Sequence, residues 1–174
     1  QRASASQKRL NEFLETTPAI QDVANPVIPE VKGNIAFNNI DFTYAHTGIK
    51  ALKNFSLKIP AGKKVVIIGR TGSGKSTIAQ LLLRMYDPDQ GGIEIDGIDI
   101  RQMNRRELRN QISYVPQDVF LFSDTIAGNI KFGLDTASDE LIRNAARQAS
   151  IEREIDLFPE GFKTMVGERG VTLS

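Results

Sequence analysis

The chain has 174 residues, 40% of them apolar and 25% charged, which is ordinary for a soluble globular protein with one domain, or one and part of another. Its 22 Lys and Arg residues nearly balance its 21 Asp and Glu residues, so the net charge of +1 excludes a strong general attraction to nucleic acid or to an anionic membrane. The absence of cysteine excludes disulfides, thiolate metal sites and a cysteine nucleophile. No apolar run is long enough to span a bilayer, and the first residues, QRASASQKRL, do not form a signal peptide.

Residues 1–33 read as a lead-in to the folded part of the chain. Three apolar side chains fall at positions i, i+3 and i+4 of a short amphipathic helix: Leu10, Phe13 and Leu14. Three prolines then interrupt residues 16–32: Pro18, Pro26 and Pro29. Prolines at this density are typical of an extended linker, whereas the apolar stripe also fits a helix packed on its own domain, and both alternatives stay open.

The next segments predict antiparallel β structure. Residues 35–44, IAFNNIDFTY, alternate enough to form a strand. Its candidate inward positions are Ile35, Phe37, Ile40 and Phe42. A turn over residues 45–48 leads to a second strand within residues 51–59. Its alternating apolar positions are Phe55, Leu57 and Ile59. Pro60, Ala61 and Gly62 then turn the chain again.

The stretch that follows, VVIIGRTGSGKST, contains the strongest motif of the sequence. Val65–Ile68 is a run of branched apolar residues ended by glycine, which predicts a buried strand of a parallel sheet. Gly69 begins a loop that contains Gly72 and Gly74, and Lys75 begins a helix. This spacing matches the phosphate-binding loop, in which two glycines separated by four residues precede Lys and Ser or Thr.

The chemistry of phosphate binding explains these residue types. Glycines let the backbone adopt positive φ and bring its N–H groups close to phosphate oxygens. A helix that starts at the phosphates adds its free N–H groups and the positive end of its dipole. We expect Lys75 to reach the β- and γ-phosphates, and Ser76 to offer its hydroxyl to a bridging Mg²⁺. The alternative is a glycine-rich strand-to-helix turn that fits the pattern by chance.

Residues 78–85 predict a helix that is apolar on most of its circumference and ends before Asp87. In residues 93–100, IEIDGIDI, two apolar pairs flank Asp96 and Gly97, which predicts a hairpin. Asn104 followed by Glu107 resembles the capping box of a short helix that continues to Asn110. Residues 112–115 predict another strand, ended by Pro116.

From Gln117 onward the pattern becomes helical. Thr125 and Ser138 are plausible N-caps of a short helix and a longer one. The longer helix carries five apolar residues at helical spacing: Leu141, Ile142, Ala145, Ala146 and Ala149. Residues 158–161, FPEG, end the helical region, and residues 167–170, GERG, form a polar loop.

Taken in order, the segments resemble the nucleotide-binding domain of an ABC transporter of the exporter type, over essentially the whole chain. The resemblance rests on Tyr44, on GRTGSGKST, on YVPQDVFLFSDTIAGNI with its Gln117, and on the closing GERG and VTLS. It implies an α/β fold, with a P-loop NTPase core, an N-terminal antiparallel β subdomain and the beginning of a helical subdomain. It also implies a linker from a transmembrane domain over residues 1–33, an ATP-binding core over 34–124 and a partial helical subdomain over 125–174.

The resemblance also assigns roles to particular residues. Tyr44 matches the aromatic residue that stacks on adenine, although by itself it reads as a cross-strand or core tyrosine. Gln117 matches the residue that approaches Mg²⁺ and the attacking water, and Glu168–Gly170 matches a loop that contacts the transmembrane domain. Without the family resemblance, Gln117 would be interpreted as a loop residue and Glu168–Gly170 as a solvated turn. The expected ATP contacts are Tyr44, Gly69, Arg70, Thr71, Gly72, Ser73, Gly74, Lys75, Ser76, Thr77 and Gln117. Ser76 and Gln117 are the expected Mg²⁺ ligands.

The chain also departs from the family pattern. Leu173 and Ser174 match the start of the signature sequence, and the family places its catalytic Glu, its switch His and an acidic Mg²⁺ anchor beyond that point. Asp96 is followed by Gly97 in a predicted hairpin, and His46 precedes the phosphate loop, so neither matches those positions. Lys75 and Gln117 are therefore the only residues of the catalytic apparatus expected here, and we expect the chain to bind nucleotide and to hydrolyse it poorly.

The leading functional prediction is the ATP-binding portion of an exporter's motor domain, which couples ATP binding and hydrolysis to export. The implied partners are ATP with Mg²⁺, a transmembrane domain and a second nucleotide-binding domain. The implied location is the cytoplasmic face of a membrane, although the isolated chain is expected to be soluble. The alternatives are a structural or interaction fragment with an empty site, an ABC-type ATPase acting on DNA, and an unrelated nucleotide kinase. Near-zero net charge disfavours DNA.

Overall fold

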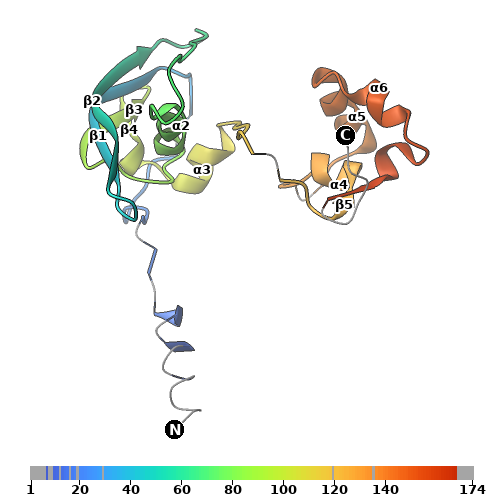
Figure 1. Cartoon of the computed structure of the whole chain (residues 1–174), viewed down its shortest axis with the longest axis horizontal. Coiled ribbons are helices and arrows are strands. Elements are labelled where there is room, and N and C mark those ends of the chain that lie inside the picture. Colours follow the sequence, from blue (N-terminus) through green and yellow to red (C-terminus); the bar gives the residue numbers. More distant parts are fainter. Residues whose placement is uncertain are drawn as a thin grey trace. The chain divides into compact units, whose positions relative to one another are not determined.

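A computed structural model describes residues 7, 10, 11, 13–15, 17, 18, 20–28, 30–118, 120–134 and 136–167. The chain divides between Ser113 and Tyr114 into two compact units (Figure 1). None of the helices in the described part combines the length and the apolar character that a bilayer crossing requires.

The first unit contains a four-stranded antiparallel sheet in the order β2-β1-β3-β4. Its strands are β1 (Ile35–Tyr44), β2 (Ile49–Ile59), β3 (Gln90–Ile95) and β4 (Ile98–Asp99). The first two confirm the predicted strand pair, and β3 and β4 form the predicted hairpin. Asn39 and Asn54, on the adjacent strands β1 and β2, have φ of 50° and 46°, and their side chains share a 2.8 Å hydrogen bond.

The core of this unit lies between the sheet and its helices α2 (Lys75–Leu82) and α3 (Arg105–Asn110), with a short 3₁₀ helix at Ile100–Gln102 (Figure 1). The predicted inward residues Phe37, Ile40 and Phe42 are buried. They pack in a cluster with Leu52, Ile78, Leu81, Ile93, Ile95, Ile100, Met103 and Leu108. Asn104 caps α3 as predicted, because its side-chain oxygen accepts from the Glu107 backbone N–H at 3.1 Å.

Two predicted strands do not form. Val65–Ile68 runs without strand pairing, and its four side chains are 41–91% exposed. Ile112–Val115 likewise has no strand, and Val115 is 87% exposed. A strand requires a neighbour that completes its backbone hydrogen bonds, and no strand within the described residues pairs with either run. The predictions of a buried parallel strand at Val65–Ile68 and of a strand at residues 112–115 were therefore wrong, although the apolar pattern is real.

The end of the lead-in is fastened to the first unit. Residues 20–28, here called the strap, run beside the segment that precedes α3. The backbone N–H of Val27 donates to the Gln102 carbonyl at 2.8 Å, and the Asn104 N–H donates to the Val27 carbonyl at 2.8 Å. By contrast, Leu10, Phe13 and Leu14 are 55–78% exposed. These three side chains are therefore not packed on the first unit, and a linker over residues 1–33 stays a prediction.

The second unit packs short helices around a small apolar core. Its helices are α4 (Ile126–Ile130), α5 (Asp139–Gln148) and α6 (Glu152–Asp156), with a 3₁₀ helix at Gly161–Lys163. Strands β5 (Asp124–Thr125) and β6 (Met165–Val166) pair antiparallel. The core residues are Ile126, Ala146, Ile155 and Val166. Thr125 and Ser138 cap α4 and α5 as predicted, through hydrogen bonds of 2.9 and 3.2 Å.

Asp96, in the turn between β3 and β4, joins this hairpin to the segment that enters β1. Its carboxylate accepts from the backbone N–H groups of Asn34 (2.9 Å), Lys32 (2.7 Å) and Gly33 (3.1 Å) and from the Asn34 side-chain amide (2.8 Å). These hydrogen bonds, the one from the Asn34 backbone foremost, hold the pKa of Asp96 far below its usual value. The ionised carboxylate is thus part of the folded structure.

We predict that Asp96→Asn destabilises the chain in a pH-dependent way. A lowered folded-state pKa stabilises the fold fully above the unfolded pKa of about 3.9, and this contribution is lost as pH falls from there toward the folded pKa. Denaturant unfolding should show the variant less stable than the wild type at neutral pH, with the difference shrinking below about pH 4. Asp89→Asn, on an exposed carboxylate, is the control. A constant difference from neutral to acid pH would contradict the assignment.

Candidate functional site

The glycine-containing loop, residues 69–74, is shaped by the backbone at its end. Gly72 and Gly74 have φ of 79° and 84°, a region that side chains disfavour. A Cβ at Gly74 would also lie 2.6 Å from the Ala51 carbonyl oxygen and 3.0 Å from the Leu52 side chain. Glycine is therefore required at position 74 by both conformation and space. This close contact seats the start of α2 directly on β2.

Lys75 is folded back over this loop. Its Nζ donates to the carbonyl oxygens of Gly69 at 2.8 Å and of Arg70 at 2.7 Å. An ammonium has three donors, so one remains for an anion. Gly74 is the N-cap of α2 and has no side chain with which to cap it, so the first-turn N–H groups of the helix have no side-chain capping bond. The loop therefore combines a held positive charge with free backbone donors, the chemistry that binds a polyphosphate.

Tyr44, at the end of β1, lies against the same helix. Its hydroxyl is 3.0 Å from Thr77 Oγ1 and donates to Gln80 Oε1 at 2.8 Å. Its ring makes edge-to-face contacts with Phe42, Tyr86 and His46, at centroid distances of 4.9, 5.4 and 5.7 Å. The structure therefore brings Tyr44 and the phosphate-loop helix together. Sequence reasoning missed Gln80, although its place one turn after Thr77 puts both on one helix face.

The other end of α2 is held by arginines. Arg109 of α3 donates to the carbonyl oxygens of Leu83 at 2.9 Å and Arg84 at 2.8 Å, which satisfies acceptors at the helix C-terminus. Arg84 is only 4% exposed. Its guanidinium donates to Asp87, to the Arg101 carbonyl and to the Gln21 carbonyl of the strap, at 3.1–3.2 Å.

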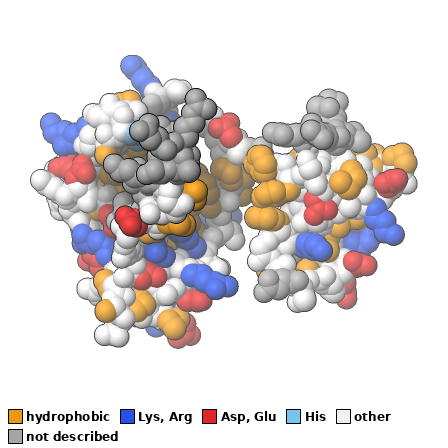
Figure 2. Space-filling model, turned by 90° about the horizontal axis from the view of Figure 1, so that it is seen from below, with side chains coloured by type: hydrophobic (Ala, Val, Ile, Leu, Met, Phe, Trp, Pro, Cys, Tyr) orange, Lys and Arg blue, Asp and Glu red, His pale blue; other side chains and the backbone are white. Residues whose placement is uncertain are grey.

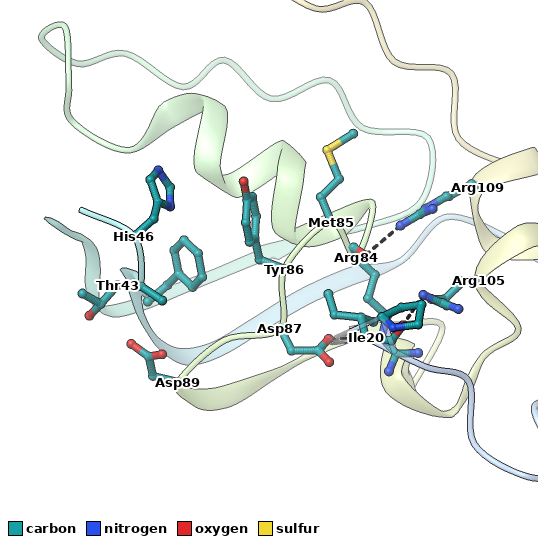
Figure 3. A pocket seen from close by; sticks show the side chains of 13 residues that line it. Ile20, Thr43, His46, Arg84, Met85, Tyr86, Asp87, Asp89, Arg105 and Arg109 are labelled. Atoms are coloured by element: carbon teal, nitrogen blue, oxygen red, sulfur yellow. Dashed lines mark hydrogen bonds and ion pairs between the residues drawn. The ribbon is translucent and has the colours of Figure 1, made fainter. Parts of the chain in front are cut away.

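The strap is also bound by Arg105 of α3. The Arg105 side chain donates to the Asp22 carboxylate at 3.0 Å and to the Ile20 carbonyl. A cavity of about 580 Å³ opens between the strap and the turn that follows α2 (Figure 3). In Figure 3, Ile20 lies beside Arg105 at one end of this cavity, and His46 and Tyr86 lie at the other.

The remaining predicted site residues lie apart or outside the described residues. Ser76 is exposed in the first turn of α2, beside Lys75. Gln117 is exposed and belongs to the second unit. The predicted contact loop Glu168–Gly170 and the signature start at Leu173 lie outside the described residues. In the described ranges no group of three or more His, Asp or Glu side chains is placed to hold a metal ion.

A cluster of exposed aromatic rings follows Gln117 in the second unit. We call it the phenylalanine patch: Phe120, Phe122 and Phe132, which are 67%, 41% and 67% exposed. Phe122 stacks on Phe132 at 4.2 Å and meets Phe120 edge to face at 5.0 Å. Asn129 holds the segment in place by exchanging hydrogen bonds of 2.8 and 3.0 Å with the Phe122 backbone. Figure 2 shows hydrophobic side chains, in orange, gathered on the surface of this unit.

Comparison with known proteins relates these features to one family. The family model described as "ABC transporter" matches residues 52–173. The chain is 44% identical over 170 residues, 95% of its length, to the mitochondrial potassium channel ATP-binding subunit of Mus musculus. It is 46% identical over 155 residues, 88% of its length, to the ATP-dependent lipid A-core flippase of Escherichia coli K12. It spans 24% and 27% of those two relatives.

A solved structure agrees with these matches. The structure of a bacterial Atm1-family ABC exporter with ATP bound superposes with a TM-score of 0.91 and 39% identity, over 99% of this chain and 30% of that one. The agreement confirms the predicted α/β fold class: a P-loop NTPase core with an N-terminal antiparallel β subdomain and the beginning of a helical subdomain. The chain belongs to the ABC transporter family, and its sequence is that of a nucleotide-binding domain of the exporter type.

Proposed function

We propose that this chain binds ATP through the loop at residues 69–74 and the first turn of α2, with the adenine on the Tyr44 ring. The observation that carries the proposal is the attachment of both parts to one helix. The Lys75 ammonium rests on the loop carbonyls at the N-terminus of α2, and the Tyr44 hydroxyl bonds to side chains of that helix. A ligand with an aromatic base at one end and a polyphosphate at the other suits this arrangement.

The residues of the loop have distinct parts in this proposal. The first-turn backbone N–H groups of α2 would donate to the phosphates, and Lys75 would exchange its carbonyl partners for phosphate oxygens, which form stronger charge-assisted hydrogen bonds. The exposed Ser76 hydroxyl is available to hold Mg²⁺ together with phosphate oxygens. When bound, Mg²⁺ neutralises charge on the β- and γ-phosphates. Oxygen ligands from a hydroxyl and from phosphates suit this ion.

We further propose that the chain works as part of the motor of an exporter at the cytoplasmic face of a membrane. The support is the exporter-type family and the solved exporter that it resembles. The names of its relatives mention lipid A-core, potassium and heavy metals, so they do not converge on one cargo. A second nucleotide-binding domain and a transmembrane domain are the proposed partners.

The phenylalanine patch supports a contact with the transmembrane partner. Three exposed aromatic rings in mutual contact are unusual on a free surface, and aromatic residues are enriched at protein interfaces. The patch begins three residues after Gln117, within the segment that the family resemblance links to membrane-domain contact. Asn129 fixes its backbone, so the rings are presented without a need for large rearrangement.

We predict that Lys75→Ala weakens ATP binding by about tenfold or more, because charge-assisted hydrogen bonds are worth about 1.5–3 kcal/mol each. Isothermal titration calorimetry with Mg-ATP on the whole chain measures this loss. Lys63→Ala, which removes an exposed lysine outside the loop, is the matched control and should bind as the wild type does. Equal affinity of the Lys75 and Lys63 variants would refute the site. A wild-type chain that does not bind ATP would favour the structural or interaction fragment instead.

We predict that the phenylalanine patch contributes little to stability. Phe132→Ser should lower the free energy of unfolding by less than about 1.5 kcal/mol, the scale of one aromatic pair, because most of the side chain is already exposed. It should also reduce the fluorescence of an apolar dye such as ANS. Ile126→Ser, at a buried position of the same unit, should cost about 2–5 kcal/mol. A similar loss of unfolding free energy in both variants would show that the rings stabilise the fold instead of being available to a partner.

A further inference from the structure

We infer that Gln80 is a positioning residue that fixes Tyr44 for stacking on the base, an inference that rests on the proposed function. Gln80 lies within α2, is partly buried and is one turn beyond Thr77. Its Oε1 accepts the Tyr44 hydroxyl at 2.8 Å. It has no expected contact with ATP, so it acts only through Tyr44.

The hydrogen bonds around the Tyr44 hydroxyl form a directed chain. A tyrosine hydroxyl has one hydrogen, and Tyr44 donates it to Gln80 Oε1. Thr77 is therefore the donor of the second bond, which joins Thr77 Oγ1 to the Tyr44 oxygen at 3.0 Å. Both partners stand on α2, whose N-terminus is the phosphate loop. The far end of the tyrosine ring is thus tied to the helix that would hold the phosphates.

The Tyr44 ring is partly exposed, and its aromatic neighbours meet it at steep angles. Among the described residues, the rings that contact Tyr44 are those of Phe42, His46 and Tyr86, and they meet it at interplanar angles of 78°, 71° and 88°. None of these rings is stacked on Tyr44. No aromatic side chain of the described residues therefore competes with an adenine for a stacked contact with Tyr44. The orientation of the Tyr44 ring is set by these T-shaped contacts and by the hydrogen bonds of its hydroxyl to Gln80 and Thr77.

In this arrangement Gln80 affects the binding of the base but not the binding of the phosphates. Gln80→Met keeps an unbranched side chain of similar length in the helix but removes the acceptor. The Tyr44 ring then loses one of its hydrogen bonds and becomes more mobile. Stacking of a base on the ring must then overcome the entropy cost of ordering it. The loop at residues 69–74 and Lys75 are untouched by this change, so a ligand consisting of phosphates alone should not respond.

The test compares the binding of ATP and of inorganic tripolyphosphate to the whole chain by calorimetry. We expect Gln80→Met to weaken ATP binding by about three- to tenfold, the range of one hydrogen bond, with tripolyphosphate affinity within about twofold of wild type. Tyr44→Phe removes this bond and the one from Thr77, so it should weaken ATP binding at least as much. The double variant should bind no more weakly than Tyr44→Phe, because that variant already lacks the bond to Gln80. Gln148→Met, at the exposed end of α5, is the matched control.

Several results would overturn the inference. An equal loss for ATP and tripolyphosphate would show that Gln80→Met distorts α2, and additive losses in the double variant would show that Gln80 and Tyr44 act separately. Unchanged ATP affinity in Gln80→Met would show that Gln80 does not position the ring. In that case Lys75→Ala would still weaken binding, so the proposed ATP site would stand while this inference fell.

A second measurement tests the positioning without nucleotide. The chain has three tyrosines, and NMR with ring-labelled tyrosine resolves them once Tyr44→Phe has identified the Tyr44 signals. Gln80→Met should shift or broaden the Tyr44 ring signals and leave those of Tyr114, in the second unit, unchanged. Unchanged Tyr44 signals would overturn the inference even if the wild-type chain bound neither ligand.

Discussion

The site depends on the fixing of helix α2 at both ends. At its N-terminus, Gly74 packs against the Ala51 carbonyl so closely that no side chain would fit. At its C-terminus, Arg109 occupies the terminal carbonyls and places a positive charge where the helix dipole is negative. An eight-residue helix is too short to be stable alone, so these attachments and the burial of Ile78 and Leu81 determine where its N-terminus points. These attachments of α2 therefore also fix the position of the phosphate loop.

The same helix links the site to the lead-in. Arg84 lies two residues beyond the end of α2 and is nearly inaccessible to solvent. Its guanidinium donates to the Gln21 carbonyl of the strap, to Asp87 and to the Arg101 carbonyl. A buried guanidinium is stable only when its donors are satisfied, so loss of the strap contacts would leave a charged group short of partners. The strap is therefore part of the fold of the first unit, and the Arg84 side chain joins it to the turn that follows α2.

Local signals predicted most of the fold, and non-local partners explain the remainder. The caps at Asn104, Thr125 and Ser138 and the hairpin at Asp96 depend on residues a few positions apart, and all of them formed as expected. Val65–Ile68 was predicted as a buried strand because its composition is right, but a strand also needs a neighbour, which the pattern of one segment cannot supply. The loop glycines and Lys75 were identifiable from their spacing. Gln80 and Arg109 were not, because their partners are distant in sequence.

The exposure of Val65–Ile68 has a consequence for handling the chain in solution. Four consecutive branched side chains with unpaired backbone are a template on which other molecules can add strands, the usual beginning of aggregation. The sequence brackets this run with Lys63 and Lys64 on one side and Arg70 on the other. If copies of this run paired as neighbouring strands, these three cations would lie close to those of the next copy and repel them. This repulsion opposes self-assembly. Colloidal stability of the chain should accordingly depend on ionic strength, since dissolved salt weakens that repulsion.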